Sequence, residues 1–107
     1  MLFADLVAFT EYSEGRDPVV VRETLTRYFE ATREVIERHG GQVEKFFGDA
    51  VMAEWGAPRT NEDDAERAVR AALEVTAAVR NLGEDLHARV AVLTGQAAVT
   101  IGATDQG

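Results

Sequence analysis

Cysteine is absent from the 107 residues of this chain. Disulfide bonds and thiolate metal sites are therefore excluded, and a reducing, cytoplasmic setting is the expected one. Proline occurs only twice, and each proline marks a boundary between expected elements. Pro18 follows Asp17 in the pattern of a helix start, and Pro58 follows Gly56 where a strand pattern stops.

Positive charge is also scarce in this sequence. Lysine and arginine together number 11, against 19 aspartates and glutamates, which gives a formal net charge of −8. A protein that binds nucleic acid polymers or anionic membranes non-specifically needs a basic face. Neither partner is expected here. The acidic balance remains compatible with a small anionic ligand that a metal ion bridges to the protein.

Long apolar runs are missing as well. No stretch approaches the roughly 20 apolar residues that a membrane-spanning helix needs, and no signal-peptide pattern is present. The length fits one small domain, and the 46% of apolar residues can build a modest core. Both ends look cut, so we expect residues 1–107 to be the N-terminal core portion of a domain whose C-terminal part is absent.

Hydrophobic periodicity predicts two helices. The first begins at Asp17 and Pro18 and ends at Gly40, with apolar residues recurring every three or four positions. The second is capped by Thr60 or Asn61 and ends at Gly83. Its expected buried stripe consists of Ala65, Ala68, Val69, Ala72, Leu73, Thr76, Val79 and Leu82.

Short apolar runs predict five strands. They lie at residues 1–6, 43–47, 50–55, 86–93 and 97–101, and the Gly48-Asp49 turn joins the second to the third. The order β-α-β-β-α-β, followed by one more short strand, is the ferredoxin-like arrangement. We therefore expect an α+β fold in which two helices cover one face of a palm-type antiparallel sheet. The first and third strands would then be neighbours at the sheet centre.

Two carboxylates stand in apolar surroundings. Asp5 interrupts the first predicted strand, and Asp49 follows an aromatic pair and precedes the third strand. Because burying an unpaired carboxylate is costly, two such acids on adjacent strands could share a divalent cation. Simpler interpretations remain open. Asp5 can pair with an arginine or cap a turn, and Gly48-Asp49 is an ordinary turn pair.

Five motifs follow one another along the chain. They are Phe3-Ala4-Asp5-Leu6-Val7-Ala8-Phe9-Thr10, His39-Gly40-Gly41, Glu44-Lys45-Phe46-Phe47-Gly48-Asp49-Ala50-Val51-Met52-Ala53, Gly56-Ala57-Pro58 and Glu62-Asp63-Asp64-Ala65. In this order and spacing they resemble the class III adenylate/guanylate cyclase catalytic domain. The resemblance extends from the first residue to about Gly102, and the palm-like fold of that family agrees with the element order above.

The resemblance implies a catalytic metal site. Asp5 and Asp49 match the two metal-binding aspartates of the family, and the backbone carbonyl of Leu6 matches a further metal ligand. Two Mg²⁺ or Mn²⁺ ions would be held over a nucleoside triphosphate, with one lowering the pKa of the ribose 3′-hydroxyl. The implied reaction converts ATP to 3′,5′-cyclic AMP and pyrophosphate.

The resemblance also implies a substrate site. The backbone amides of Val7, Ala8, Phe9 and Thr10 match the triphosphate cradle at the start of a helical segment. Lys45 matches the residue that reads the purine, where lysine resembles the adenylate type and guanylate cyclases usually carry glutamate. Without the resemblance, Lys45 would be interpreted as a solvated lysine that protects an edge strand.

The chain departs from the family pattern in two ways. Ala8 replaces the usual glycine, and its Cβ could crowd the triphosphate if this position needs a positive φ. The second base-reading residue of the family, and its downstream asparagine and arginine, lie beyond position 107. Because the family works as a dimer whose subunits share the site, we expect a homodimer and little activity from this chain alone.

A second class of function stays open. The chain could be a non-catalytic regulatory or dimerisation module that keeps the cyclase fold. Binding of a metal–nucleotide complex that depends on Asp5 and Asp49 separates the enzyme from such a module.

Overall fold

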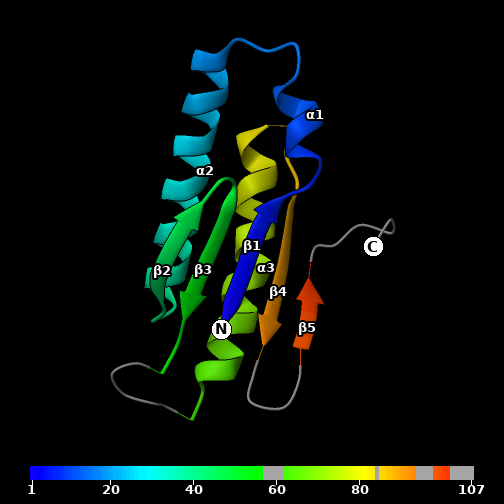
Figure 1. Ribbon diagram of the computed structural model, residues 1–107. Helices are drawn as coiled ribbons and strands as arrows, with labels where there is room; N and C mark the ends of the chain where they lie inside the picture. The colour runs from blue at the N-terminus through cyan, green and yellow to red at the C-terminus, as the bar shows by residue number, and fades with distance from the viewer. Residues whose placement is uncertain (57–61, 84, 94–97, 102–107) are drawn as a thin grey trace.

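The computed structural model describes residues 1–56, 62–83, 85–93 and 98–101, and its elements follow the expected order (Figure 1). They are β1 (Leu2–Leu6), α1 (Phe9–Ser13), α2 (Pro18–Arg38), β2 (Gln42–Phe47), β3 (Ala50–Glu54), α3 (Asp64–Leu82), β4 (Ala88–Leu93) and β5 (Ala98–Ile101). The β-α-β-β-α-β order with one added strand is confirmed, and α1 adds a short helix before α2. None of the helices in these ranges has the length and apolarity needed to cross a bilayer.

The five strands form one antiparallel sheet. Its strand order is β2-β3-β1-β4-β5, so β1 lies at the centre between β3 and β4. Leu2 pairs with Ala53 on one side, and Asp5 pairs with Arg89 on the other. The prediction that the first and third strands are neighbours is therefore confirmed.

The two faces of the sheet differ sharply. Both α2 and α3 lie behind the sheet in Figure 1 and cover the same face. The buried residues of β1, β3 and β4 alternate along their strands and form the core with these helices; they are Leu2, Ala4, Leu6, Val51, Ala53, Ala88, Val90 and Val92. Phe3, Asp5, Met52, Arg89 and Ala91 alternate with them on the opposite side, which we call the open face.

Helix α2 has the termini that its sequence predicts. The Asp17 side chain accepts a hydrogen bond of 2.8 Å from the Val19 amide, and Pro18 occupies the first helical position. Gly40 has a φ of +87°, the left-handed conformation that terminates many helices. The buried residues Tyr28, Thr32, Val35 and Ile36 recur at helical spacing and face the sheet.

Helix α3 differs from its prediction at three points. It begins at Asp64 with Asp63 as the N-cap residue, whereas the expected caps Thr60 and Asn61 lie outside the described residues. Ala65 and Leu73 were predicted to be buried, but both are exposed, Leu73 to 55%. The fully buried residues of α3 include Ala71, Ala72 and Val75. Leu73 lies about 140° around the helix from the buried Ala68. Helix α3 thus packs against the core mainly through small alanine side chains, and Leu73 lies on its solvent-exposed side.

The end of α2 is attached to β3 and α3. The Trp55 indole donates a hydrogen bond of 2.9 Å to the His39 carbonyl, and His39 Nε2 lies 2.8 Å from Glu74 Oε1. Hydrogen bonds from His39 and Arg38 hold the pKa of Glu74 below its usual value. Gly41 lies directly under the Trp55 ring, so this junction depends on a residue without a side chain.

Replacing Gly41 with alanine is expected to destabilise the domain. The added Cβ would lie 2.6 Å from two atoms of the Trp55 ring and 2.9 Å from Ile36. Overpacking of this kind costs about 1–3 kcal/mol, measurable as a lower free energy of unfolding in urea. Gly83→Ala is the matched control, because its Cβ would meet its nearest neighbour, Leu86, at an ordinary 3.6 Å. Equal stability of the two variants would contradict the proposed packing.

Candidate functional site

The Gly48-Asp49 turn is tied to the end of the central strand. Asp49 Oδ2 accepts a hydrogen bond of 2.9 Å from the Leu6 amide, across 43 residues of sequence. Gly48 has a φ of +60°, which allows the tight connection between β2 and β3. The contact brings the Asp49 carboxylate to Leu6, the residue that follows Asp5. We call this place, where β1 ends beside the β2–β3 turn, the corner.

Asp5 lies at the same end of β1, on the open face. Its carboxylate accepts two hydrogen bonds from Arg89 of β4, at 3.2 Å from Nε and 3.0 Å from Nη2. Hydrogen bonding to Asp5, together with its negative charge, raises the pKa of Arg89. Of the interpretations open at the sequence level, pairing of Asp5 with an arginine is thus realised in this structure.

Sequence reasoning did not single out Arg89 as a site residue. A signal was present, because Arg89 is the one charged residue within the apolar strand Ala88–Leu93, as Asp5 is in Leu2–Leu6. Both strands are inner strands of the sheet, and their register sets the two residues directly opposite each other. A lone cation and a lone anion in neighbouring strands indicate such a pair.

A hollow on the open face adjoins this pair. It has a volume of about 300 Å³ and is lined by Phe3, Asp5, Phe47, Ala50, Arg89 and Ala91, with Ala4 and Val51. This volume is at the lower end of the range for small-molecule sites. Apolar side chains form most of the wall, and Asp5 and Arg89 are its charged lining residues.

A β-bulge in β2 decides the face on which Lys45 lies. Val43 pairs with Ala53, and Lys45 pairs with Met52. The pairing moves by two residues in β2 and by one in β3, so Glu44 has no partner residue in the ladder. Without this shift, Lys45 would share the helix-covered face with Val43. The bulge instead puts Lys45 in the row of Met52 and Phe3 on the open face.

The chain leaves β1 through the expected phosphate cradle. The Val7 amide donates a hydrogen bond of 2.8 Å to the His87 carbonyl, so this amide is already engaged. Ala8 follows with a φ of +53°, the left-handed conformation, and α1 begins at Phe9. The first amides of a helix have no acceptor within the helix. The amides of Phe9 and Thr10 stand at the start of α1 and are therefore the ones of the expected cradle that could bind a phosphate.

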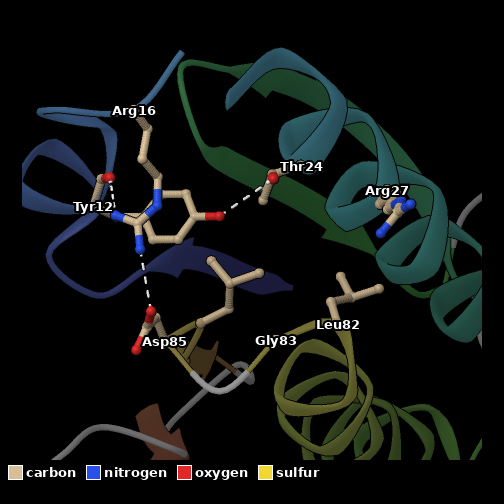
Figure 2. Close-up of a pocket in the computed structure, with 8 residues that line it drawn as sticks. Tyr12, Arg16, Thr24, Arg27, Leu82, Gly83 and Asp85 are labelled. Atoms are coloured by element: carbon tan, nitrogen blue, oxygen red, sulfur yellow. Dashed lines mark hydrogen bonds and ion pairs between the residues drawn. The ribbon is translucent and has the colours of Figure 1, made fainter. Parts of the chain in front are cut away.

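A network on the other side of α1 holds this helix in place (Figure 2). The Arg16 guanidinium stacks on the Tyr12 ring at 3.9 Å, donates to the Tyr12 carbonyl, and bonds Asp85 at 3.1 Å. The Tyr12 and Thr24 hydroxyls lie 3.3 Å apart and connect α1 to α2. A small cavity of about 100 Å³ lies between these groups and Leu86. Helix α1 is therefore fixed to α2 and to the segment before β4.

The structure thus collects most of the predicted site residues on one side. Asp5, Leu6 and Asp49 meet at one corner, and Val7 to Thr10 continue directly from it. Lys45 lies farther away on the same open face, separated from β1 by the width of β3. A palm-type sheet with two carboxylates at one corner is typical of domains that bind nucleotides through metal ions.

Comparison with known proteins agrees with this class. A family profile described as the adenylate and guanylate cyclase catalytic domain matches residues 1–105. Adenylate cyclase 1 of Rhizobium meliloti is 43% identical over 74 residues, which are 69% of this chain and 11% of that protein. An adenylate cyclase of Mycobacterium tuberculosis is 32% identical over 99 residues, covering 89% of this chain and 22% of that protein.

Solved structures give the same result. The crystal structure of the guanylyl cyclase Cya2 superposes with a TM-score of 0.77 at 28% identity, covering 98% of this chain and 62% of that one. The chain belongs to the adenylate and guanylate cyclase catalytic domain family. It spans between 11% and 22% of the length of the two curated relatives above.

Replacing Ala8 with glycine is expected to leave stability unchanged or raise it by up to about 1.5 kcal/mol. The left-handed conformation costs a non-glycine residue about 1–2 kcal/mol, whereas the extra freedom of glycine in the unfolded chain offsets about 0.4–1 kcal/mol. Urea unfolding measures the difference. Ala78→Gly in the interior of α3 is the control and should lose about 1 kcal/mol. A similar loss for both variants would mean that Ala8 is not strained.

Proposed function

We propose that this chain is the metal- and triphosphate-binding part of an adenylate cyclase. In this reaction the ribose 3′-oxygen of ATP bonds to the α-phosphorus, the bond to the β-phosphate oxygen breaks, and pyrophosphate leaves. The observation that carries the proposal is the Leu6–Asp49 hydrogen bond, which brings two acids from separate elements to one corner.

The residues at this corner suit Mg²⁺ or Mn²⁺. Both ions favour oxygen ligands, and Mg²⁺ is commonly bound by one or two carboxylates together with substrate phosphates. Within the described ranges, no three histidine, aspartate or glutamate side chains group closely enough to cage a metal. Asp5, Asp49 and the Leu6 carbonyl would hold two ions with help from the nucleotide. Bound there, the ions acidify the 3′-hydroxyl and neutralise phosphate charge.

Arg89 would change its partner when a cation occupies Asp5. In this structure its guanidinium neutralises Asp5, with both side chains partly exposed. A divalent ion competes for the same carboxylate oxygens. Once released, Arg89 remains at the edge of the hollow on the open face, where a guanidinium can bind phosphate oxygens.

The nucleotide would extend across the open face. Amides at the start of α1 suit the triphosphate, and Lys45 on β2 would contact the purine. Two strand spacings separate β1 from β2, about 10 Å, so a base and a triphosphate can reach the two regions at once. The lysine at this position favours adenine, as in the adenylate type of the family.

The open face would also be the surface of a homodimer. Phe47 is 56% exposed beside the hollow, and the described helices leave this face uncovered. In an intact cyclase, a second subunit would bury this apolar surface and supply the asparagine, the arginine and the second base-reading residue that the family resemblance implies. These groups are not among residues 1–107, so we expect the chain alone to turn over ATP far more slowly than an intact cyclase.

Asp5→Asn and Asp49→Asn are each expected to weaken Mn²⁺–ATP binding at least tenfold in calorimetry, because each removes a charged metal ligand. Glu66→Gln is the matched control, since this exposed carboxylate pairs with Arg70 on α3, away from the site. Wild-type affinity in both aspartate variants would favour the non-catalytic regulatory or dimerisation module.

Cyclic AMP formation by the wild-type chain should be slight. Turnover near that of intact cyclases would contradict the expectation that residues outside 1–107 are needed.

Lys45 is the only lysine in the sequence, which allows a direct test of nucleotide contact. Saturating Mn²⁺–ATP is expected to slow acylation of Lys45 by an amine-selective reagent several-fold, and Mn²⁺–GTP to slow it less. The Met1 amino group is an internal reference, because it binds the Leu93 carbonyl at the other end of β1 from Asp5. Peptide mass spectrometry quantifies both amines. Equal labelling of Lys45 with and without nucleotide would show that it does not contact the base.

A further inference from the structure

Two hydroxyls in the core of the protein have no hydrogen-bond partner. Tyr28 and Thr32 lie one turn apart on the inner side of α2, and both are completely buried. Neither Tyr28 Oη nor Thr32 Oγ1 bonds any group in the part of the chain that the structure describes. Leaving a buried hydroxyl without a partner is costly, and native proteins normally satisfy such groups, with ordered water where needed.

From the place of Tyr28 on α2 we expect its side chain to lean toward the end of the sheet where Asp49 lies. Long side chains on a helix point toward its N-terminus. The N-terminal end of α2 lies at the same end of the sheet as the β2–β3 turn and the end of β1 (Figure 1). The Tyr28 ring packs 5.2 Å from Phe29, which packs 4.7 Å from Phe46, three residues before Asp49.

The electrostatics of Tyr28 agree with this direction. Burial raises the pKa of its phenol well above the usual value, and the negative charges of Asp49 and then Asp5 raise it further. The phenol is therefore neutral at physiological pH and remains a hydrogen-bond donor. Both carboxylates lie close enough for their charges to act on it.

Asp49 has one carboxylate oxygen that can accept a further hydrogen bond. Its Oδ2 accepts from the Leu6 amide, whereas Oδ1 accepts no hydrogen bond from any described residue. A carboxylate offers about four lone-pair sites, so Oδ1 can accept one donor and still bind a cation. Within the described residues, Tyr28 Oη thus lacks an acceptor and Asp49 Oδ1 has room for a donor.

We propose that Tyr28 is a positioning residue for Asp49. Its hydroxyl donates to a buried water, which donates in turn to Asp49 Oδ1. This bridge holds the carboxylate in the orientation that accepts from the Leu6 amide and presents its second oxygen at the corner. The effect on metal binding rests on the function proposed above, whereas the effect on the Leu6–Asp49 bond does not.

Tyr28→Phe tests the bridge because it removes only the hydroxyl. In the metal-free chain we expect the Leu6 amide to exchange with deuterium three- to tenfold faster relative to the Ala4 amide of the same strand. In calorimetry we expect the dissociation constant for Mn²⁺ to rise three- to tenfold. The free energy of unfolding should change little, since Tyr28→Phe keeps the packing of the ring and removes only the bridge.

Thr32→Val is the matched control. It removes the other buried, unpartnered hydroxyl from the same side of α2, one turn farther from the β2–β3 turn. It should change neither Leu6 exchange nor Mn²⁺ affinity. Tyr28→Met fills much of the ring volume without a hydroxyl, and it should reproduce the Tyr28→Phe pattern.

Two results would overturn the role of Tyr28. One is wild-type exchange at Leu6 in Tyr28→Phe, and the other is an equal change in Thr32→Val. If the wild-type chain binds no Mn²⁺, the proposed function fails, yet Leu6 exchange still decides whether Tyr28 positions Asp49. If exchange changes and Mn²⁺ affinity does not, the bridge exists but the metal site lies elsewhere.

Discussion

The hydrogen bond from the Leu6 amide to Asp49 Oδ2 determines how the central strand ends. β1 pairs with β4 from Leu2 to Leu6, but its pairing with β3 stops at Ala4. Beyond that point an amide on the β3 side needs an acceptor, since an unpaired backbone group in a sheet is costly. The side chain of the turn supplies it. One carboxylate therefore closes the ladder, fixes the hairpin against β1, and sets where the chain departs toward α1.

The second acid of the corner is balanced differently. Asp5 is neutralised by Arg89, and the two side chains are 35% and 47% exposed. Ion pairs as exposed as this contribute only about 0–1 kcal/mol to stability. Such a pair keeps a carboxylate in an apolar strand without locking it, so under the proposed function a divalent cation would displace the arginine at little cost. Asp49 is held by a backbone amide and would keep its place.

Much of this arrangement could be predicted from the sequence because local signals agree with each other. Asp17 and Pro18 start α2, Gly40 ends it, and the Gly48-Asp49 pair forms the hairpin turn. What could not be predicted depends on contacts between distant residues. The Asp5–Arg89 pair spans 84 positions, and only strand register brings it together. The exposure of Leu73 follows from how closely α3 packs, which helical spacing alone leaves undetermined.

The bulge at Glu44 shows why core and site cannot be considered separately. β2 must place Phe46 against Phe29 in the core and Lys45 on the open face, and a regular strand that also buries Val43 cannot do both. The extra residue resolves the conflict, so the packing of Phe46 fixes the position of Lys45. Because Tyr28 and Phe29 are adjacent on α2, one short segment of this helix supports both the Asp49 corner and the Lys45 strand. A substitution on the buried side of α2 would therefore alter the distance between the Asp49 corner and Lys45, although it changes no residue of either.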